Sequence, residues 1–169
     1  MPAKKHVLIA IGLLALIAWL ALTLTQKPMA PNIEITTLDG KKIALDSLRD
    51  KVVLVNFWAT SCPGCIQEMP LLVDTYRNYQ ARGLEIVAVA MNYDPPEYVR
   101  NYARQHNLPF TVALDTTGKA AEAFNRVKLT PTSFIIDRKG HIIQQTIGEL
   151  DSAQLKALLE QQLGGATSS

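Results

Sequence analysis

Cys62 and Cys65 are the only two cysteines among the 169 residues, and they stand three positions apart in the stretch WATSCPGC. Such a pair could bind part of a metal site, form a structural disulfide, remain as two inert buried thiols, or act as a redox dithiol. Zinc needs four ligands, and His6, His106 and His141 show no ligand spacing around the pair. A structural disulfide would close a loop of about four residues and stabilise the fold by only about 2 kcal/mol. Spacing alone leaves the four alternatives open.

The segments on either side of the pair favour the redox dithiol. The run KVVLVNFWA before it is rich in β-branched residues and predicts a buried strand. The run CIQEMPLLVDTYRNYQARG has apolar residues at helical spacing and ends at Gly83. Cys62 would therefore stand at a helix N-terminus, where unpaired N–H groups and the helix dipole stabilise a thiolate. Cys65, one turn further, would be shielded yet close enough to attack a mixed disulfide formed at Cys62.

The remainder of the domain must position this pair. We expect a small hairpin over residues 33–48, strands at LEIVAVAM and FTVALD, and an antiparallel pair at TSFIID and HIIQQTIG. Helices are expected at DPPEYVRNYARQH, at KAAEAF and after Asp151. Asp94 is expected to cap the first of these with Glu97 in a capping box, and Asp151 to cap the last. This alternation predicts an α/β fold whose mixed sheet is covered by helices on both faces.

The N-terminus carries a separate signal. Lys4 and Lys5 precede an uncharged run of eighteen residues, Val7–Leu24. A helix of this length reaches about 27 Å, close to the thickness of a bilayer's hydrocarbon core. We expect residues 1–25 to be a retained signal-anchor, not a cleaved signal peptide, because the run is long and a poor cleavage context follows it. The basic flank predicts a cytoplasmic N-terminus and a C-terminal domain on the other side of the membrane.

The charge distribution describes the rest of the chain. All 15 acidic residues follow the apolar run, as do 15 of the 17 basic residues, so the net charge of +2 belongs to the N-terminal flank. This neutral domain excludes nucleic acid as a partner, and we expect a monomer. We expect residues 26–32 to form a short stiff linker, residues 33–163 the folded domain and residues 164–169 a disordered tail.

Two segments carry a family resemblance. VNFWATSCPGCIQEMP and LTPTSFIIDRKGHI resemble the thioredoxin superfamily, specifically its membrane-anchored TlpA/ResA/DsbE-like branch, over about residues 32–163. The resemblance implies a thioredoxin-like fold with an extra N-terminal β-hairpin. It also implies that Cys62 is the nucleophile and Cys65 the resolving thiol, with their redox-active disulfide in place of any cofactor or metal.

The resemblance assigns further residues to the site. Pro131 is similar to the family's cis-proline, which faces the disulfide, and Thr130 before it would offer backbone hydrogen bonds to an extended substrate segment. Trp58 resembles the aromatic residue beside the active site and is expected to contribute to substrate binding. These three residues are therefore predicted substrate-binding residues.

The proton-transfer group is less clearly marked by the sequence. Asn56 occupies the place where thioredoxin itself carries a buried acid, and an amide cannot titrate. Glu68 and Asp94 are the candidates for that role. As alternatives, Glu68 is expected to be a first-turn acid favoured by the helix dipole, and Asp94 a helix cap.

The resemblance implies a function for the whole chain. It indicates a single-pass thiol-disulfide oxidoreductase of a bacterial inner membrane, with its domain in the periplasm or extracytoplasmic space. It would reduce disulfide-bearing proteins, for example in cytochrome c maturation, and be re-reduced by a membrane electron-donor thiol protein. Oxidation is an alternative direction, since Pro63 and Gly64 do not fix the potential.

Two other classes of function remain as alternatives. A peroxiredoxin-like thiol peroxidase shares the fold, although Ala59 stands where a threonine three positions before Cys62 would be expected. A copper-delivery protein would need an added histidine or methionine near the dithiol. Met69 lies within the predicted helix and His141 lies beyond the hairpin turn, so neither supplies that ligand.

Overall fold

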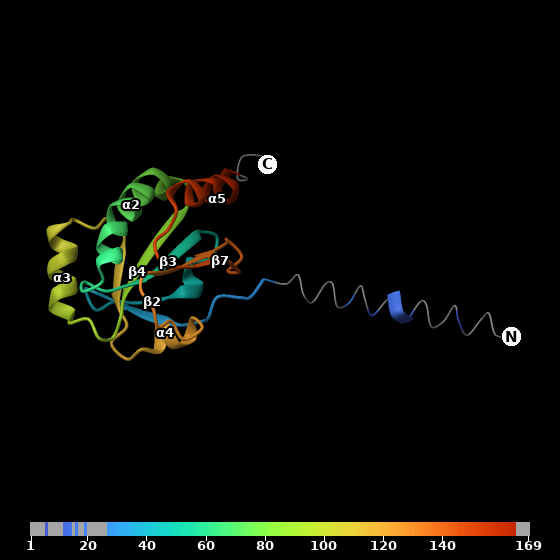
Figure 1. Ribbon diagram of the computed structural model, residues 1–169, viewed down its shortest axis with the longest axis horizontal. Helices are drawn as coiled ribbons and strands as arrows, with labels where there is room; N and C mark the ends of the chain where they lie inside the picture. Colours follow the sequence, from blue (N-terminus) through green and yellow to red (C-terminus); the bar gives the residue numbers. More distant parts are fainter. Residues whose placement is uncertain (1–5, 7–11, 15, 17–18, 20–26, 165–169) are drawn as a thin grey trace.

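The computed structural model describes residues 6, 12–14, 16, 19 and 27–164 (Figure 1). The predicted signal-anchor over residues 1–25 falls largely outside these residues, as do residues 165–169 of the predicted tail. Among the residues that are described, no helix combines the length and apolar character needed to cross a membrane.

A mixed seven-stranded sheet forms the centre of the domain, in the order β2-β1-β5-β4-β3-β6-β7. Its strands are β1 (Glu34–Thr37), β2 (Lys42–Ala44), β3 (Val52–Trp58), β4 (Leu84–Ala90), β5 (Thr111–Leu114), β6 (Thr132–Ile136) and β7 (Ile142–Ile147). Strands β3, β4 and β5 are parallel, and the remaining neighbours are antiparallel. The predicted mixed sheet and N-terminal hairpin are confirmed.

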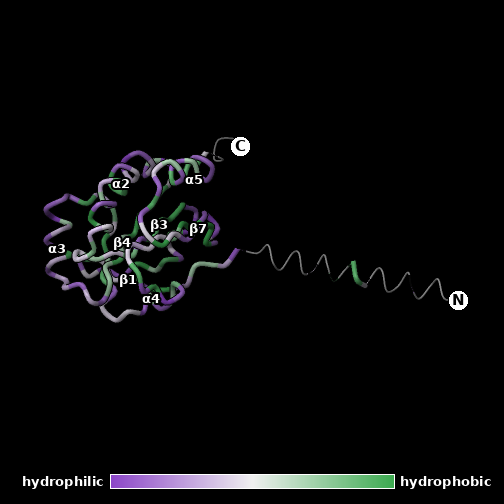
Figure 2. Tube along the Cα trace, viewed as in Figure 1, coloured by the Kyte–Doolittle hydropathy of each residue, from purple (hydrophilic) through white to green (hydrophobic). Residues whose placement is uncertain are grey.

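Helices cover both faces of this sheet (Figure 1). They are η1 (Leu45–Leu48), α2 (Pro63–Tyr79), η2 (Gln80–Arg82), α3 (Pro96–Gln105), α4 (Lys119–Ala123) and α5 (Ser152–Gly164). Helices α2, α3 and α5 pack on one face, while α4 and η1 pack on the other. The hydrophobic stretches of the chain gather in the central strands, and the hydrophilic stretches lie mainly in the outer turns of the helices and in the loops (Figure 2). This arrangement confirms the predicted α/β fold, a mixed sheet covered by helices on both faces.

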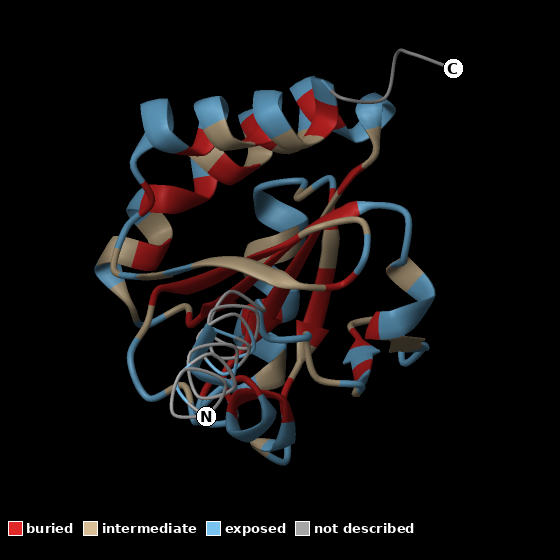
Figure 3. Ribbon diagram, turned by 90° about the vertical axis from the view of Figure 1, so that its right-hand side faces the viewer, coloured by how far each residue is buried: buried red, intermediate tan, exposed pale blue. Residues whose placement is uncertain are grey.

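Strand β3 connects the two apolar layers because successive side chains point to opposite faces. Its seven residues are all buried. Leu54 and Trp58 pack with α2, α3 and α5, whereas Val55 and Phe57 pack with α4 and η1. The buried side of α2 and α5 faces the sheet, and their outer sides are exposed (Figure 3). A rigid, fully buried strand therefore leads directly into the cysteine pair.

The N-terminal segment of the domain is paired with the turn between β6 and β7. Ala30 N donates to Gly140 O at 2.8 Å, and Ile142 N donates to Pro28 O at 2.8 Å. The predicted boundary of the linker, residues 26–32, is therefore wrong at its C-terminal side, and the folded part begins at about Pro28. The physical reason is that the edge of the sheet offers unpaired backbone groups, which an extended segment satisfies.

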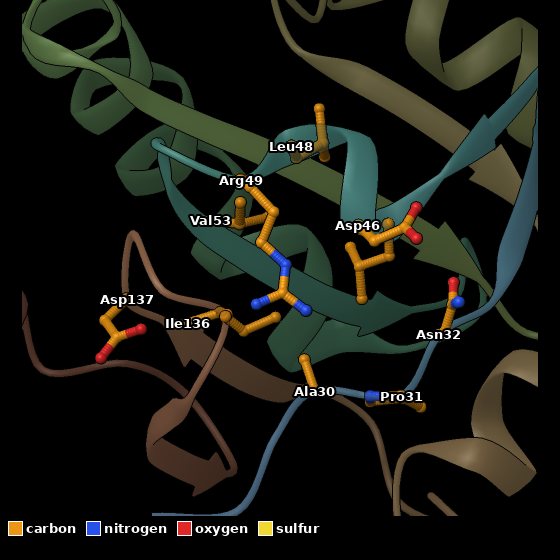
Figure 4. A pocket seen from close by; sticks show the side chains of 11 residues that line it. Ala30, Pro31, Asn32, Asp46, Leu48, Arg49, Val53, Ile136 and Asp137 are labelled. Carbon is orange, nitrogen blue, oxygen red and sulfur yellow. The ribbon is translucent and has the colours of Figure 1, made fainter.

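A small cavity of about 20 Å³ lies beneath this segment. Figure 4 shows the Arg49 side chain extending toward Ile136 and Ala30, which line the cavity. Its volume admits about one water molecule. None of the predicted site residues lines it, and it lies near the start of β3, so it is not the functional site.

Candidate active site

Cys62 and Cys65 lie where β3 gives way to α2. Cys62 is the N-cap of α2, with extended backbone angles (φ −99°, ψ 107°), and Pro63 occupies the first turn. Proline is well suited to that position because no intrahelical hydrogen bond is lost there. The two cysteines form a disulfide with a Cα–Cα distance of 5.2 Å.

The two sulfurs differ in their accessibility. Cys62 is half-buried, whereas Cys65 is only 1% exposed. The Cys62 Sγ accepts a hydrogen bond from the Cys65 backbone N at 3.2 Å, so a helix N–H group points at this sulfur. Such donors stabilise negative charge on the sulfur after reduction. The geometry therefore presents Cys62 to a partner and keeps Cys65 behind it.

Pro131 packs against the turn between the cysteines. The Thr130-Pro131 peptide bond is cis, which confirms the expectation from the family resemblance. A Cβ atom added to Gly64 would lie 3.6 Å from Pro131 Cδ, so the ring lies beside this turn. Thr130 is half-buried at the rim, and its Oγ1 lies 3.3 Å from the Tyr93 hydroxyl. The structure brings Thr130 and Pro131 beside the dithiol, and their contact with substrate stays a prediction.

Glu68 is a buried acid beneath the dithiol, with only 3% of its surface exposed. It accepts hydrogen bonds from Asn56 Nδ2 at 3.0 Å and from Leu150 N at 2.6 Å. Burial raises the pKa of Glu68, the two hydrogen bonds oppose this rise, and the nearby charge of Glu149 adds to it. The expectation of a first-turn acid favoured by the helix dipole is wrong, because α2 begins at Pro63 and no acidic residue lies in its first turn. Glu68 is three positions after Cys65, a spacing that places both on the same side of the helix.

Asp94 lies on the other side of the dithiol loop and is 5% exposed. Its carboxylate accepts hydrogen bonds from the Thr60 backbone N and from Thr60 Oγ1, both at 2.6 Å. The predicted capping box is wrong, since the N-cap of α3 is Pro95 and no side chain caps that helix. The physical reason is that Thr60 presents two donors to the carboxylate. Asp94 thus holds the turn ahead of Cys62 and is a positioning residue.

Trp58 has no exposed surface. Its ring packs against Tyr102 with a centroid distance of 5.3 Å, and its Nε1 has no hydrogen-bond partner within the described part of the chain. Trp58 is therefore enclosed in the core, and its contact with substrate stays a prediction. Its place at the end of β3 makes it part of the core that supports the dithiol loop.

The junction between β7 and α5 completes the site and was not identified from the sequence. Gly148 has a φ of +97°, which favours glycine, and its N donates to Pro131 O at 2.8 Å. The turn places Glu149 beside Gly64 and directs Leu150 N at Glu68. A glycine between the last strand and the last helix was the available signal, but its distant partners could not be read from it.

The arrangement supports exchange of electrons between two thiols and a disulfide. One sulfur is accessible, the second is shielded, and a buried carboxylate lies one helical turn beyond it. Across the described ranges, no group of three or more histidine, cysteine, aspartate or glutamate side chains is placed to hold a metal ion. The accessible sulfur of Cys62 and the shielded sulfur of Cys65 support thiol-disulfide exchange at Cys62.

Comparison with known proteins agrees with this geometry. The family model described as AhpC/TSA matches residues 27–145. The thiol-disulfide oxidoreductase ResA of Bacillus thuringiensis subsp. konkukian is 39% identical over 131 residues, covering 78% of this chain and 75% of the relative. ResA of Bacillus subtilis strain 168 is 32% identical over 126 residues, which are 75% of this chain and 69% of the relative.

Solved structures give the same result. A thioredoxin-family thiol:disulfide interchange protein from Chlorobium tepidum has a TM-score of 0.75 and 30% identity, and the match covers 83% of this chain and 99% of that one. The family model alone spans residues 27–145, which include strands β1 to β6 of the central sheet. The chain belongs to the thioredoxin-like AhpC/TSA family, among the thiol-disulfide oxidoreductases of the ResA type.

Proposed function

We propose that this protein is a membrane-tethered thiol-disulfide oxidoreductase that reduces disulfides in extracytoplasmic proteins, with cytochrome c maturation as its setting. The observation that carries the proposal is the asymmetric pair, in which Cys62 is accessible at the N-terminus of α2 and Cys65 is buried behind it. Thr130 and Pro131 lie beside the pair, where an extended disulfide-bearing segment would dock.

The reduced pair would act in two steps. The Cys62 thiolate attacks one sulfur of a substrate disulfide, which forms a mixed disulfide and releases a substrate thiolate that takes up a proton. Cys65 then loses its proton and attacks Cys62 Sγ, which releases the second substrate thiol and closes the Cys62–Cys65 disulfide. The protein thereby gives two electrons to the substrate, and a membrane electron-donor thiol protein restores the dithiol.

Glu68 is the acceptor that we propose for the Cys65 proton. Its raised pKa gives its carboxylate a stronger affinity for a proton than an exposed glutamate has. Asn56 Nδ2 and Leu150 N hold the carboxylate in place on the same side of α2 as Cys65. Asp94 does not share this role, since both of its oxygens are engaged by Thr60.

The path of the chain supports a tethered domain with a free active site. The apolar run Val7–Leu24 and the flanking Lys4 and Lys5 carry the proposal of a bacterial inner-membrane anchor with the domain outside the cytoplasm. The chain enters the domain at residues 28–30, beside the β6–β7 turn. Seven residues of β3 separate that end of the sheet from the dithiol loop, a distance of about 20 Å. A tether at one end therefore leaves the dithiol accessible at the other.

The reduction potential of the full chain in mild detergent tests the direction of the reaction. A potential near that of thioredoxin, about −270 mV, together with reduction of insulin disulfides, is the expected result. A potential near about −120 mV, that of a strong oxidant, would overturn the proposed reductase. Fractionation tests the tether: the full-length chain should remain with membranes after an alkaline carbonate wash, and its release by that wash would overturn the anchor.

A further inference from the structure

Glu149 places a negative charge beside the dithiol. A Cβ atom added to Gly64, between the two cysteines, would lie 3.1 Å from Glu149 Oε1. Covalent geometry limits the distance from this oxygen to the Cys65 Cα to about 8 Å. Glu149 is exposed and makes no hydrogen bond or ion pair with residues 27–164. Its charge is therefore available to a segment that docks at the dithiol.

The surface next to the Thr130-Pro131 segment is largely apolar. Tyr93, Leu129 and Ile147 are respectively 56%, 64% and 62% exposed. Tyr93 contacts Thr130, and Ile147 pairs with Thr132, the residue after Pro131. Apolar contacts of this kind hold a peptide without selecting its charge.

The other charged groups around Glu149 leave its effect intact. Glu68 is buried beneath it, and Asp151 is occupied as the cap of α5, where its Oδ1 accepts from Gln154 N. Lys128, exposed in the loop before Leu129, forms no ion pair with Glu149 in the described structure. Among the described residues, no contact therefore neutralises the Glu149 carboxylate at the edge of the dithiol turn.

We propose that Glu149 is a specificity-determining residue, which favours substrate segments with a lysine or arginine near the attacked cysteine and disfavours those with aspartate or glutamate. The inference rests on the proposed thiol-disulfide exchange and adds the class of substrate. An extended segment advances about 3.3 Å per residue, so a side chain one or two residues from the cysteine can approach Glu149. Two unit charges about 6 Å apart in a largely solvated setting change a rate constant by about threefold to tenfold.

A pair of matched peptides tests this proposal. Each contains one intramolecular disulfide, and the two differ only in having lysine or glutamate at the positions flanking the cysteines. The full chain in detergent is reduced, freed of reductant and mixed with peptide, and the reduced peptide is quantified by chromatography. The reaction transfers two electrons from the protein dithiol to the peptide disulfide. The ratio of the two rate constants cancels any effect of a variant on the intrinsic reactivity of Cys62.

The wild-type chain should reduce the lysine peptide faster than the glutamate peptide. Glu149→Gln should lower the ratio of the lysine-peptide rate constant to the glutamate-peptide rate constant by about threefold to tenfold, and Glu149→Lys should reverse the preference. Added salt should lower the wild-type ratio toward that of Glu149→Gln. Asp74→Asn is the matched control, because Asp74 is an exposed acid about 14 Å further along α2 than Cys65. Its ratio should equal the wild-type value.

The outcomes separate the two proposals. If the wild-type chain reduces neither peptide, the proposed function itself is overturned. If it reduces both peptides with a ratio that Glu149→Gln leaves unchanged, the function stands and the role of Glu149 is overturned. An equal fall in Asp74→Asn and Glu149→Gln would also overturn it, because the effect would then come from net charge and not from the place of Glu149.

Discussion

Replacing Glu68 with glutamine should slow the reaction and change how stability depends on pH. The introduced amide has nearly the size of the carboxylate, and its oxygen can still accept from Leu150 N, as Glu68 Oε1 does at 2.6 Å. The Asn56 amide can turn so that its Oδ1, which has no partner among the described residues, accepts from the new NH₂ group. The site therefore keeps its shape and loses only its charge and its ability to take a proton.

The effect on the reaction follows from the loss of a proton acceptor for Cys65. A positioned general base contributes about 10²-fold to 10⁴-fold to a rate. We expect a loss of about 10²-fold in the step that closes the Cys62–Cys65 disulfide, because this is the step in which the buried Cys65 gives up its proton. Stopped-flow mixing of the reduced chain with insulin should show a mixed disulfide that forms at nearly the wild-type rate and decays slowly.

Whereas the substitution slows the reaction, it should remove a pH-dependent loss in the free energy of unfolding. Because burial raises the pKa of Glu68, the folded chain keeps a proton that the unfolded chain releases above its ordinary value of 4.5. This contribution to the free energy of unfolding is full below that value and is lost as the pH rises through the folded pKa. The loss amounts to at most about 1.4 kcal/mol for each pH unit in this interval. The glutamine variant has no such proton, so its stability should not show this fall.

Urea unfolding of the oxidised chain between about pH 4 and pH 8 measures the difference, with Glu97→Gln on the exposed side of α3 as the control. The control should keep both the wild-type rate and the wild-type pH dependence. Wild-type closure of the disulfide by Glu68→Gln would refute the role in proton transfer. An unchanged fall in its stability with rising pH would refute the burial argument.

Two further substitutions test how the fold positions the site. Asp94→Ala leaves both Thr60 donors without their acceptor and should lower the free energy of unfolding by about 3 kcal/mol. Thr60→Val removes only the hydroxyl donor and should lower it by about 1 kcal/mol. Equal losses for the two variants in urea unfolding would contradict the paired hydrogen bonds. Leu159→Ala removes a fully buried side chain of α5 and should lower the free energy of unfolding by about 3 kcal/mol. Leu158→Ala, at a half-buried position, should lower it by less, and equal losses would contradict the packing of α5.

Local patterns made much of the fold predictable. The β-branched run before the cysteines and the apolar spacing after them predicted β3 and α2, because both signals lie within one segment. The capping role of Asp151 was likewise local and is confirmed, since Gln154 N donates to Asp151 Oδ1 at 2.8 Å. The cis Thr130-Pro131 bond came from the family resemblance and not from spacing.

Residues whose partners are distant in sequence were the ones that could not be placed. Asp94 stands before a proline and a helix, which fits a cap, yet its partner Thr60 is 34 residues away. Glutamate is a residue type typical of the protein surface, and Leu150 N, which donates a hydrogen bond to Glu68, is 82 residues away in the sequence. A sequence shows which side of a helix a residue takes but not what covers that side. The cysteines of the site could therefore be predicted from the sequence, whereas the surroundings of its acids could be learned only from the tertiary structure.

Trapping of the covalent intermediate tests most directly that Cys62 attacks and Cys65 resolves. The reduced Cys65→Ser chain, mixed with insulin, should accumulate a mixed disulfide through Cys62, because no second thiol can release it. The reduced Cys62→Ser chain should trap almost none, since Cys65 is 1% exposed. Non-reducing gels and mass spectrometry of the linked peptides measure both. Equal trapping by the two variants, or linkage through Cys65 alone, would contradict the assigned roles.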